Sequence, residues 1–178
     1  MSTSAHALKT LEKTEYILFA GGPLSTEAGD IISKYCQLIP NIGSTELEHV
    51  PPTISKTSPQ NWKYYQWPYY PDIHLEAHDE GLFEMAVYRS ANSRLLHGVF
   101  HVLPELQKWR TRDLFSKHAT KDGLWGFESR TDDIIVLSNG EKVNPLEMEG
   151  VIECHDLVHK AMIADQEMTE CVLFVEPD

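Results

Sequence analysis

The opening of the chain constrains the fold most, because an apolar run, a glycine turn and a helical period follow one another there. The run from Tyr16 to Ala20 has the length of a buried strand, and Gly21-Gly22-Pro23 ends it sharply. Apolar residues then recur at helical spacing from Ala28 to Cys36, and Ser25 stands where it can cap the first helical turn. A second extended segment begins at Leu38. The opening therefore predicts a β-α-β unit of a parallel sheet.

The two polar turns of this unit point to a ligand site. Gly21-Gly22-Pro23 follows the first expected strand, and the segment from Asn41 to Glu46 follows the second. The carboxyl ends of parallel strands meet at one edge of the sheet, and ligands bind at that edge in open α/β sheets. We therefore expect any ligand of this unit to lie at that end of the sheet.

The middle of the chain has a different composition. The segment from Val50 to Pro71 contains five prolines and six tryptophan or tyrosine residues. We interpret these rings as packing at a junction between subdomains, and a stacking platform for a ligand is the alternative. The apolar content of Gly81 to Arg89 and of Leu95 to Val102 predicts two strands of a smaller, mostly antiparallel unit.

The last third of the chain contains turn residues and helix-cap residues that predict its elements. Asn139-Gly140 follows a β-branched run, which predicts a hairpin. Asn144 can cap a helix that starts with Pro145, where proline suits the first position. Two further strands are predicted from Val158 to Ala164 and from Cys171 to Val175.

Composition and charge disfavour two classes of binding partner. The 178 residues carry 15 Lys and Arg against 27 Asp and Glu, a formal charge of −12, which disfavours nucleic acid and anionic membranes as partners. No apolar run approaches the ~20 residues that cross a bilayer, and the first twenty residues do not resemble a signal peptide. We therefore expect a cytoplasmic protein without a membrane partner.

The cysteines and histidines do not predict a metal centre. Cys36, Cys154 and Cys171 are an odd number at wide spacing, so we interpret them as reduced thiols. Two pairs of histidines have the i, i+4 spacing, namely His97/His101 and His155/His159. Neither pair has the companion glutamate of a zinc motif, which favours satisfied or solvated histidines over zinc ligands.

Five segments, in order along almost the whole chain, resemble the adenylate-forming (AMP-binding) enzyme superfamily, which contains the acyl-CoA synthetases and the adenylation domains of nonribosomal peptide synthetases. The first segment, Phe19 to Ser25, is similar to the family's G-G-x-P-L-S turn. The resemblance implies that Gly21, Gly22 and Pro23 lie against the adenine of a bound nucleotide. Taken alone, the same residues could form a plain tight turn.

The second segment, Gly43-Ser44-Thr45-Glu46, resembles the family's Y-G-x-T-E signature. The resemblance implies that these residues bind the nucleotide, with the Thr45 hydroxyl at the α-phosphate and the Glu46 carboxylate on Mg²⁺. Ile42 stands where the family has a tyrosine that stacks on adenine. Ile42 offers an apolar face without a ring, so we expect weak affinity for adenosine. Without its neighbours this segment would be an ordinary polar loop.

The third segment, Trp109 to Leu114, is similar to the family's Y-R-T-G-D-L sequence. Its aspartate takes the ribose hydroxyls in the family, so the resemblance assigns Asp113 to the nucleotide site. Arg112 replaces the usual glycine and changes the approach to the sugar; the alternative is a surface basic residue.

The last two segments resemble the hinge and the C-terminal lid of the family. Ser129 to Ile135 is similar to the G-R-x-D-D-x-V/I hinge, which implies that Arg130 contacts the nucleotide and that Asp132 is the pivot of the lid. Ser138 to Val143 matches the glycine hairpin, and Gly140 would line the channel for a pantetheine thiol. A solvated turn and surface ion pairs are the alternatives for these charged residues.

The sequences of these segments are similar to those of the fungal reductases that resemble nonribosomal peptide synthetases. Such enzymes use ATP and Mg²⁺ to activate a carboxylic acid as its adenylate, load it onto the phosphopantetheine of a carrier domain, and reduce the thioester. The resemblance implies a partial adenylate-forming fold of the α/β and α+β classes. Its expected parts are an end of the N-terminal α/β subdomain over 1–49, a β-rich subdomain over 50–129, and the hinge and part of the C-terminal lid over 130–178.

Two parts of the family pattern do not occur in the 178 residues. These are the Ser/Thr/Gly-rich loop that wraps the ATP phosphates and the lysine of the lid. We therefore assign no catalytic residue and expect a fragment of a carboxylate-activating ligase that is inactive alone, because a cation at the α-phosphate is a large part of the catalysis. The alternative is a noncatalytic, acidic interaction or regulatory module that docks to a partner or a paralogue.

Overall fold

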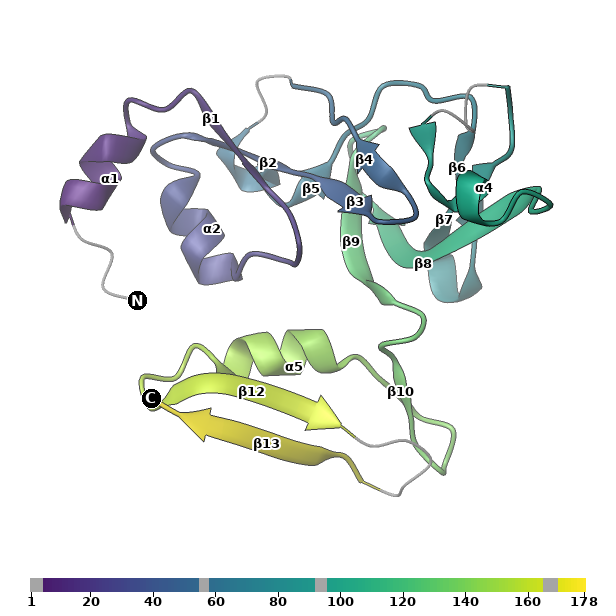
Figure 1. The fold of residues 1–178 in the computed structure, drawn as a ribbon. Helices are drawn as coiled ribbons and strands as arrows, with labels where there is room; N and C mark the ends of the chain where they lie inside the picture. The colour runs from purple at the N-terminus through teal and green to yellow at the C-terminus, as the bar shows by residue number, and fades with distance from the viewer. Residues whose placement is uncertain (1–4, 55–57, 92–95, 165–169) are drawn as a thin grey trace. The chain divides into compact units, whose positions relative to one another are not determined.

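A computed structural model describes residues 5–54, 58–91, 96–164 and 170–178 of the chain (Figure 1). Helices and strands alternate at the start and end of the chain, and an antiparallel sheet lies between them in the sequence, so the fold class is α/β and α+β as predicted. The chain divides into two compact units, Met1–Glu128 and Ser129–Asp178. The subdivision expected after residue 49 lies inside the first unit and stays a prediction.

The predicted β-α-β unit is confirmed. Strand β1 (Tyr16–Phe19) pairs in parallel with β2 (Gln37–Pro40), and α2 (Thr26–Ile32) connects them. The Ser25 hydroxyl accepts a hydrogen bond from the Ala28 N–H at 3.3 Å, which is the expected cap. A further helix, α1 (Ala5–Leu11), precedes β1 and was not predicted.

Trp62 fixes the aromatic segment onto α2. Its indole lies so close to Gly29 that a Cβ there would stand 2.1 Å from the ring, so only glycine fits. The indole N–H donates to the Asp30 carboxylate at 2.9 Å. Trp62 follows the short helix η1 (Pro59–Asn61) and is 4% exposed. This ring is packing, as the sequence indicated.

A five-stranded sheet in the order β5-β9-β8-β7-β6 forms the rest of the first unit. Its strands are β5 (Tyr64–Tyr65), β6 (Ile73–Ala77), β7 (Phe83–Tyr88), β8 (Lys108–Lys117) and β9 (Trp125–Arg130), with the short helix η2 (Asp79–Gly81) before β7. The pairs β5–β9, β6–β7 and β7–β8 are antiparallel. One hydrophobic core joins this sheet to the hairpin of β3 (Ile42–Ser44) and β4 (Glu48–Val50). The rings of Tyr65, Trp67 and Tyr70 pack against that core.

The strand predicted from Leu95 to Val102 is wrong. Leu95 lies outside the described residues, and the helix α4 (Val99–Val102) occupies the end of the segment. Val99 and Phe100 are buried next to each other, whereas His101 and the residue after it are exposed. Such paired burial suits a helical turn, and the apolar content alone had suggested a strand.

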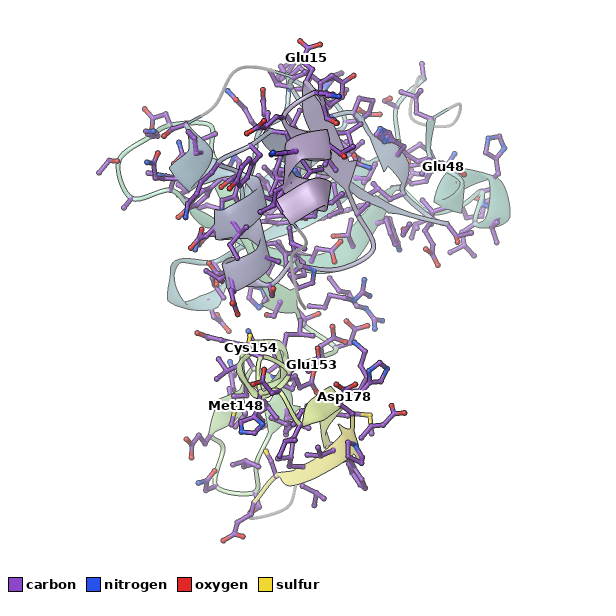
Figure 2. The ribbon with its side chains drawn as sticks, turned by 90° about the vertical axis from the view of Figure 1, so that its left-hand side faces the viewer. Glu15, Glu48, Met148, Glu153, Cys154 and Asp178 are labelled. Carbon is purple, nitrogen blue, oxygen red and sulfur yellow. The ribbon has the colours of Figure 1, made fainter. Side chains whose placement is uncertain are left out.

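The second unit contains the predicted hairpin, helix and strands. They are β10 (Ile135–Val136), β11 (Lys142–Val143), α5 (Pro145–Ile152), β12 (Val158–Ala164) and β13 (Val172–Pro177). The Asn144 side chain accepts from the Leu146 N–H at 3.2 Å and begins α5. Glu153, labelled in Figure 2, follows the last turn of α5 and accepts a hydrogen bond from the Ala161 N–H of β12 at 3.1 Å. Helix and sheet are thereby joined along β12.

In the described part of the chain, no helix has the length and apolar character that crossing a membrane requires.

Candidate functional site

The glycine turn and the β3–β4 hairpin leave the parallel strands at the same edge. Phe19 pairs with Pro40 at the carboxyl ends of β1 and β2, and the Asn41 N–H donates to the Phe19 carbonyl at 2.9 Å. Gly21 has φ +89°, which favours glycine, and a Cβ at Gly21 or Gly22 would meet nothing within 4 Å. The backbone of the turn is therefore open to a ligand at the edge where the sequence predicted one.

The β3–β4 hairpin is closed by a tight approach and a side-chain bond. A Cβ at Gly43 would stand 2.6 Å from the Glu48 carbonyl, so glycine lets the two strands meet. Figure 2 labels Glu48 on this hairpin, where its φ is +60°. The Ser44 hydroxyl accepts from the Leu47 N–H at 3.1 Å, which folds the turn over Ser44 to Leu47. Ser44 thus has a structural bond in addition to its predicted place at the nucleotide.

Thr45 and Glu46 occupy the turn of the hairpin with exposed side chains. No cluster of three or more His, Cys, Asp or Glu side chains suited to a metal exists in the described ranges. One exposed carboxylate nevertheless fits Mg²⁺, which commonly takes one or two carboxylates together with substrate phosphates. Ile42 is half-buried against the main core and presents an aliphatic surface beside the turn.

The strand that carries Asp113 bulges away from its neighbour. Glu84 pairs with Leu114 and Ala86 with Arg110, so β8 advances four residues while β7 advances two. The extra residues lie between Arg110 and Leu114. Bulges of this kind redirect side chains and are frequent beside active sites.

Thr111 fixes the shape of the bulge. Its hydroxyl donates to the Met85 carbonyl at 3.1 Å and accepts from the Asp113 N–H at 3.1 Å. Arg112, between them, has φ +69°, which explains why the family pattern has glycine here. Asp113 is 9% exposed. Thr111 was not among the residues predicted for the site, although the family's R-T-x-D pattern contains it.

Tyr65 of β5 lies near Asp113. Burial raises the pKa of Tyr65 to about 12, and the negative charge of Asp113 adds to the rise. The Tyr65 ring stacks on Trp67 with centroids 5.3 Å apart and meets the Phe115 ring edge-on at 5.6 Å. A neutral phenol and a carboxylate are therefore placed together, and sequence reasoning had treated Tyr65 only as one of six rings.

The second unit holds the other predicted residues. The Arg130 guanidinium forms two bonds with the Asp132 carboxylate, Nε to Oδ1 at 3.0 Å and Nη2 to Oδ2 at 3.1 Å. Gly140 has φ +84° in the hairpin turn and is exposed. The site residues before 128 therefore belong to one unit, and Arg130, Asp132 and Gly140 belong to the other.

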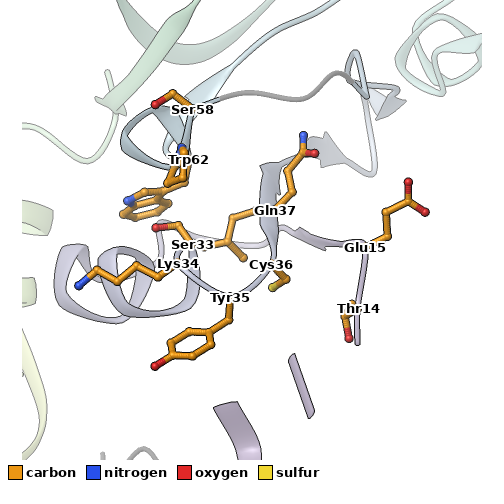
Figure 3. Close-up of a pocket in the computed structure, with 11 residues that line it drawn as sticks. Thr14, Glu15, Ser33, Lys34, Tyr35, Cys36, Gln37, Ser58 and Trp62 are labelled. Atoms are coloured by element: carbon orange, nitrogen blue, oxygen red, sulfur yellow. The ribbon is translucent and has the colours of Figure 1, made fainter. Parts of the chain in front are cut away.

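A cavity of about 320 Å³ lies in the first unit (Figure 3). Its lining includes Thr14 and Glu15 ahead of β1, Cys36 and Gln37 at the start of β2, and Trp62. None of the predicted site residues lines it. It lies at the amino ends of the parallel strands, opposite the glycine turn. Burial raises the pKa of the Cys36 thiol.

Comparison with known proteins agrees with the arrangement of these elements. The family described as the AMP-binding enzyme C-terminal domain matches residues 132–178. A carboxylic acid reductase of Neurospora crassa is 30% identical over 99% of this chain, which covers 17% of that protein. The adenylate-forming reductase Nps10 of Heterobasidion annosum is 29% identical over 96% of this chain and 16% of its own length. The chain thus spans about a sixth of these relatives.

Solved structures show the same fold. The adenylation domain of the carboxylic acid reductase of Segniliparus rugosus, solved with AMP and a carboxylic acid, matches 90% of this chain and 26% of its own, with TM-score 0.56 and 16% identity. The o-succinylbenzoate CoA synthetase of Bacillus subtilis matches 97% of this chain and 39% of its own, with TM-score 0.59 and 18% identity. The fold is therefore that of part of an adenylate-forming enzyme. The chain belongs to the adenylate-forming superfamily, as a partial adenylation domain similar to those of fungal carboxylic acid reductases.

Proposed function

We propose that the first unit is part of the nucleotide site of a domain that activates a carboxylic acid with ATP and Mg²⁺. The observation that supports this most is the shared edge of β1 and β2, which places the open backbone of Gly21 and Gly22 beside the hairpin that carries Thr45 and Glu46. In such a site ATP supplies the adenylyl group to the acid, and pyrophosphate leaves.

Each residue has a role that follows from its surroundings. The backbone from Gly21 to Pro23 and the aliphatic face of Ile42 would border the adenine, and the Thr45 hydroxyl would meet the α-phosphate. The exposed Glu46 carboxylate would be the protein ligand of Mg²⁺. Asp113, set by the bulge of β8, would accept hydrogen bonds from the ribose hydroxyls, and its burial lets it act with little competition from water.

The second unit would supply the hinge and the lid. Arg130 would exchange its bonds to Asp132 for the nucleotide, and the backbone at Asp132 would turn as the pivot. Gly140 would line the path of a phosphopantetheine thiol from a carrier domain, which accepts the acyl group. We infer a reductase of the synthetase-like kind as the larger setting, since two of the relatives reported above are such proteins.

Residues 1–178 alone should be inactive, because they contain neither a phosphate loop nor a lid lysine. We expect no acid-dependent ATP–pyrophosphate exchange from them with a panel of carboxylic acids. A chimera with the flanking segments of a related full-length enzyme should recover exchange. In that chimera Glu46→Ala and Asp113→Ala should each lower exchange at least about 10²-fold, since an electrostatic contact in the transition state is lost.

Two exposed carboxylates outside the proposed site serve as controls for the loss of a negative charge. Glu105→Ala and Asp122→Ala, both exposed in loops of the first unit, should leave exchange in the chimera unchanged. Robust exchange by residues 1–178 themselves would contradict the proposal, because another cation would then have to act at the α-phosphate.

A noncatalytic interaction module remains the second candidate, and β13 favours it. Val172, Leu173, Phe174 and Val175 of this strand are 44–53% exposed. Apolar surface of that kind commonly marks a contact with another protein. A chimera that folds but neither binds ATP nor catalyses exchange would favour this second role.

A further inference from the structure

The hairpin turn with Thr45 and Glu46 is held from one side by the three residues His97, Gly98 and Val99, which we call the clamp. His97 Nδ1 lies 2.7 Å from the Leu47 carbonyl oxygen, and the Val99 N–H donates to the Glu46 carbonyl at 3.0 Å. Two consecutive carbonyls of the turn are thus bonded to the clamp. The side chains of Thr45 and Glu46 take no part in these bonds.

Gly98 allows the clamp to approach the hairpin turn closely. A Cβ at Gly98 would stand 2.8 Å from the Thr45 carbonyl oxygen and 3.0 Å from Glu48 Oε1. The backbone oxygen cannot move away without shifting the turn, so only glycine fits. The clamp therefore contacts every residue of the turn from Thr45 to Leu47.

A buried pair of polar groups stands behind the clamp. His97 and Asp72 are 4% and 3% exposed, and His97 Nε2 lies 3.6 Å from Asp72 Oδ2. Neither atom has a hydrogen-bond partner among the described residues. Buried polar atoms without partners are costly and call for a reason.

Proton placement supplies that reason. The imidazole lies between two acceptors, the Leu47 carbonyl and the Asp72 carboxylate, so Nδ1 must carry a proton to donate to Leu47. A second proton, on Nε2, points an N–H toward the Asp72 carboxylate 3.6 Å away, a separation beyond hydrogen-bond length, whereas without it a lone pair faces a carboxylate. Opposite charges in a buried site attract each other more strongly than they do in water.

The pair connects the hairpin to the central sheet. The Asp72 carbonyl accepts from the Tyr88 N–H at 2.8 Å, at the end of β7. On the other side Arg89 donates to the Leu103 carbonyl at 3.0 Å, just past α4, and stacks its guanidinium on the Phe100 ring. Glu48 across Gly98 and Arg89 across Phe100 are the charged groups that flank the clamp.

We propose that Asp72 and His97 are positioning residues for the candidate nucleotide site, acting as a buried carboxylate–imidazolium pair that fixes the clamp on the turn of Thr45 and Glu46. The inference rests on the proposed function for its purpose, but its geometry is independent of any nucleotide. Both side chains are buried, so neither is placed to touch a ligand. Loss of the pair should loosen the turn while the rest of the sheet keeps its stability.

Variants at both positions test the His97–Leu47 hydrogen bond and the His97–Asp72 pair separately. His97→Gln can reach Asp72 but not the Leu47 carbonyl, so amide exchange at Leu47 and Val99 of residues 1–178 should quicken about tenfold. The Met85 amide in β7 should not change and serves as the control. Asp72→Asn can donate its amide to a neutral imidazole, so exchange at the turn should stay within about twofold of the original chain, whereas Asp72→Ala should quicken it as His97→Gln does.

A spectroscopic signature distinguishes a protonated Nε2 from simple packing. The ¹⁵N signal of His97 Nε2 should be that of a protonated nitrogen in the original chain at neutral pH, and that of an unprotonated one in Asp72→Asn. In the active chimera, His97→Gln should raise the KM for Mg·ATP several-fold more than it lowers kcat.

An unprotonated Nε2 in the original chain, or unchanged exchange at Leu47 and Val99 in His97→Gln, would overturn the proposal. If His97→Gln unfolds the whole unit, the Met85 amide also exchanges faster, and the ¹⁵N signature in Asp72→Asn then decides. Failure of the chimera to bind nucleotide would leave the exchange and ¹⁵N results standing, so the two proposals fail separately.

Discussion

Arg112 lies at a backbone position that favours glycine. Its φ of +69° costs an L-residue roughly 1–2 kcal/mol relative to glycine, less the entropy that glycine loses on folding. Arg112→Gly should therefore exceed Arg112→Ala in free energy of unfolding by about 0.5–1 kcal/mol. Urea denaturation of the two variants measures the difference, and Ala isolates the backbone effect because both changes remove the same guanidinium. Equal stabilities would mean that the bulge does not impose this conformation.

The site residues differ in how far the sequence could predict them. Gly21 was found because a tight turn leaves a local sequence signal, and Gly43 was found through the resemblance to the family's Y-G-x-T-E signature. Thr111 and Tyr65 were missed, because their importance comes from pairing between strands that are distant in the chain. His97 was dismissed as a metal ligand, and its bond to the Leu47 carbonyl spans 50 residues of sequence, which no local pattern reveals.

The same distinction holds for the elements. The parallel pair of β1 and β2, the hairpin around Gly140 and the helix α5 could be predicted, since an apolar period and a cap lie within each segment. The helix α4 could not, because its four residues are too few to show a period and its conformation is set by packing on the β3–β4 turn.

A charged ladder crosses the strands β6, β7 and β8. The Lys108 ammonium and the Tyr88 hydroxyl donate to Glu76, and these bonds hold the pKa of Glu76 below its usual value. A lowered pKa in the folded state stabilises the fold above the unfolded pKa of about 4.5, and this contribution is lost as the pH falls below it.

Glu76→Gln should therefore make the free energy of unfolding depend less strongly on pH in the acid range. The variant should be less stable than the original chain at pH 7 but should lose less of its stability between pH 5 and pH 3, as measured by urea midpoints at each pH. Glu105→Gln, on an exposed loop, is the control and should follow the original curve. Parallel curves for Glu76→Gln and the original chain would contradict the assignment.

The strand β13 leaves apolar side chains exposed on the second unit. Phe174 is 53% exposed, and its neighbours on the strand are similar. Open strand edges with apolar faces favour self-association, so residues 1–178 should bind a hydrophobic dye and form oligomers.

Two substitutions test the source of that association. Phe174→Lys should reduce dye fluorescence and shift light scattering toward the monomer, whereas Tyr69→Lys, at an 86% exposed aromatic residue of the first unit, should change neither. A monodisperse monomer that melts sharply and reversibly would contradict this view of β13.

The edge of β1 and β2 should bind a nucleotide together with Asp113. The most direct measurement is titration of ¹⁵N-labelled residues 1–178 with Mg²⁺ and AMP, followed through the backbone amide signals. Affinity should be millimolar or weaker, and Ile42→Tyr should tighten it at least about fivefold, since stacking on a base contributes roughly 1–3 kcal/mol. Shifts in the Ile42→Tyr chain should fall on Gly21, Gly22, the β3–β4 hairpin and Asp113, and should vanish in Asp113→Asn but persist in Asp122→Asn. Shifts confined to the cavity beside Trp62, or none in Ile42→Tyr, would contradict the account.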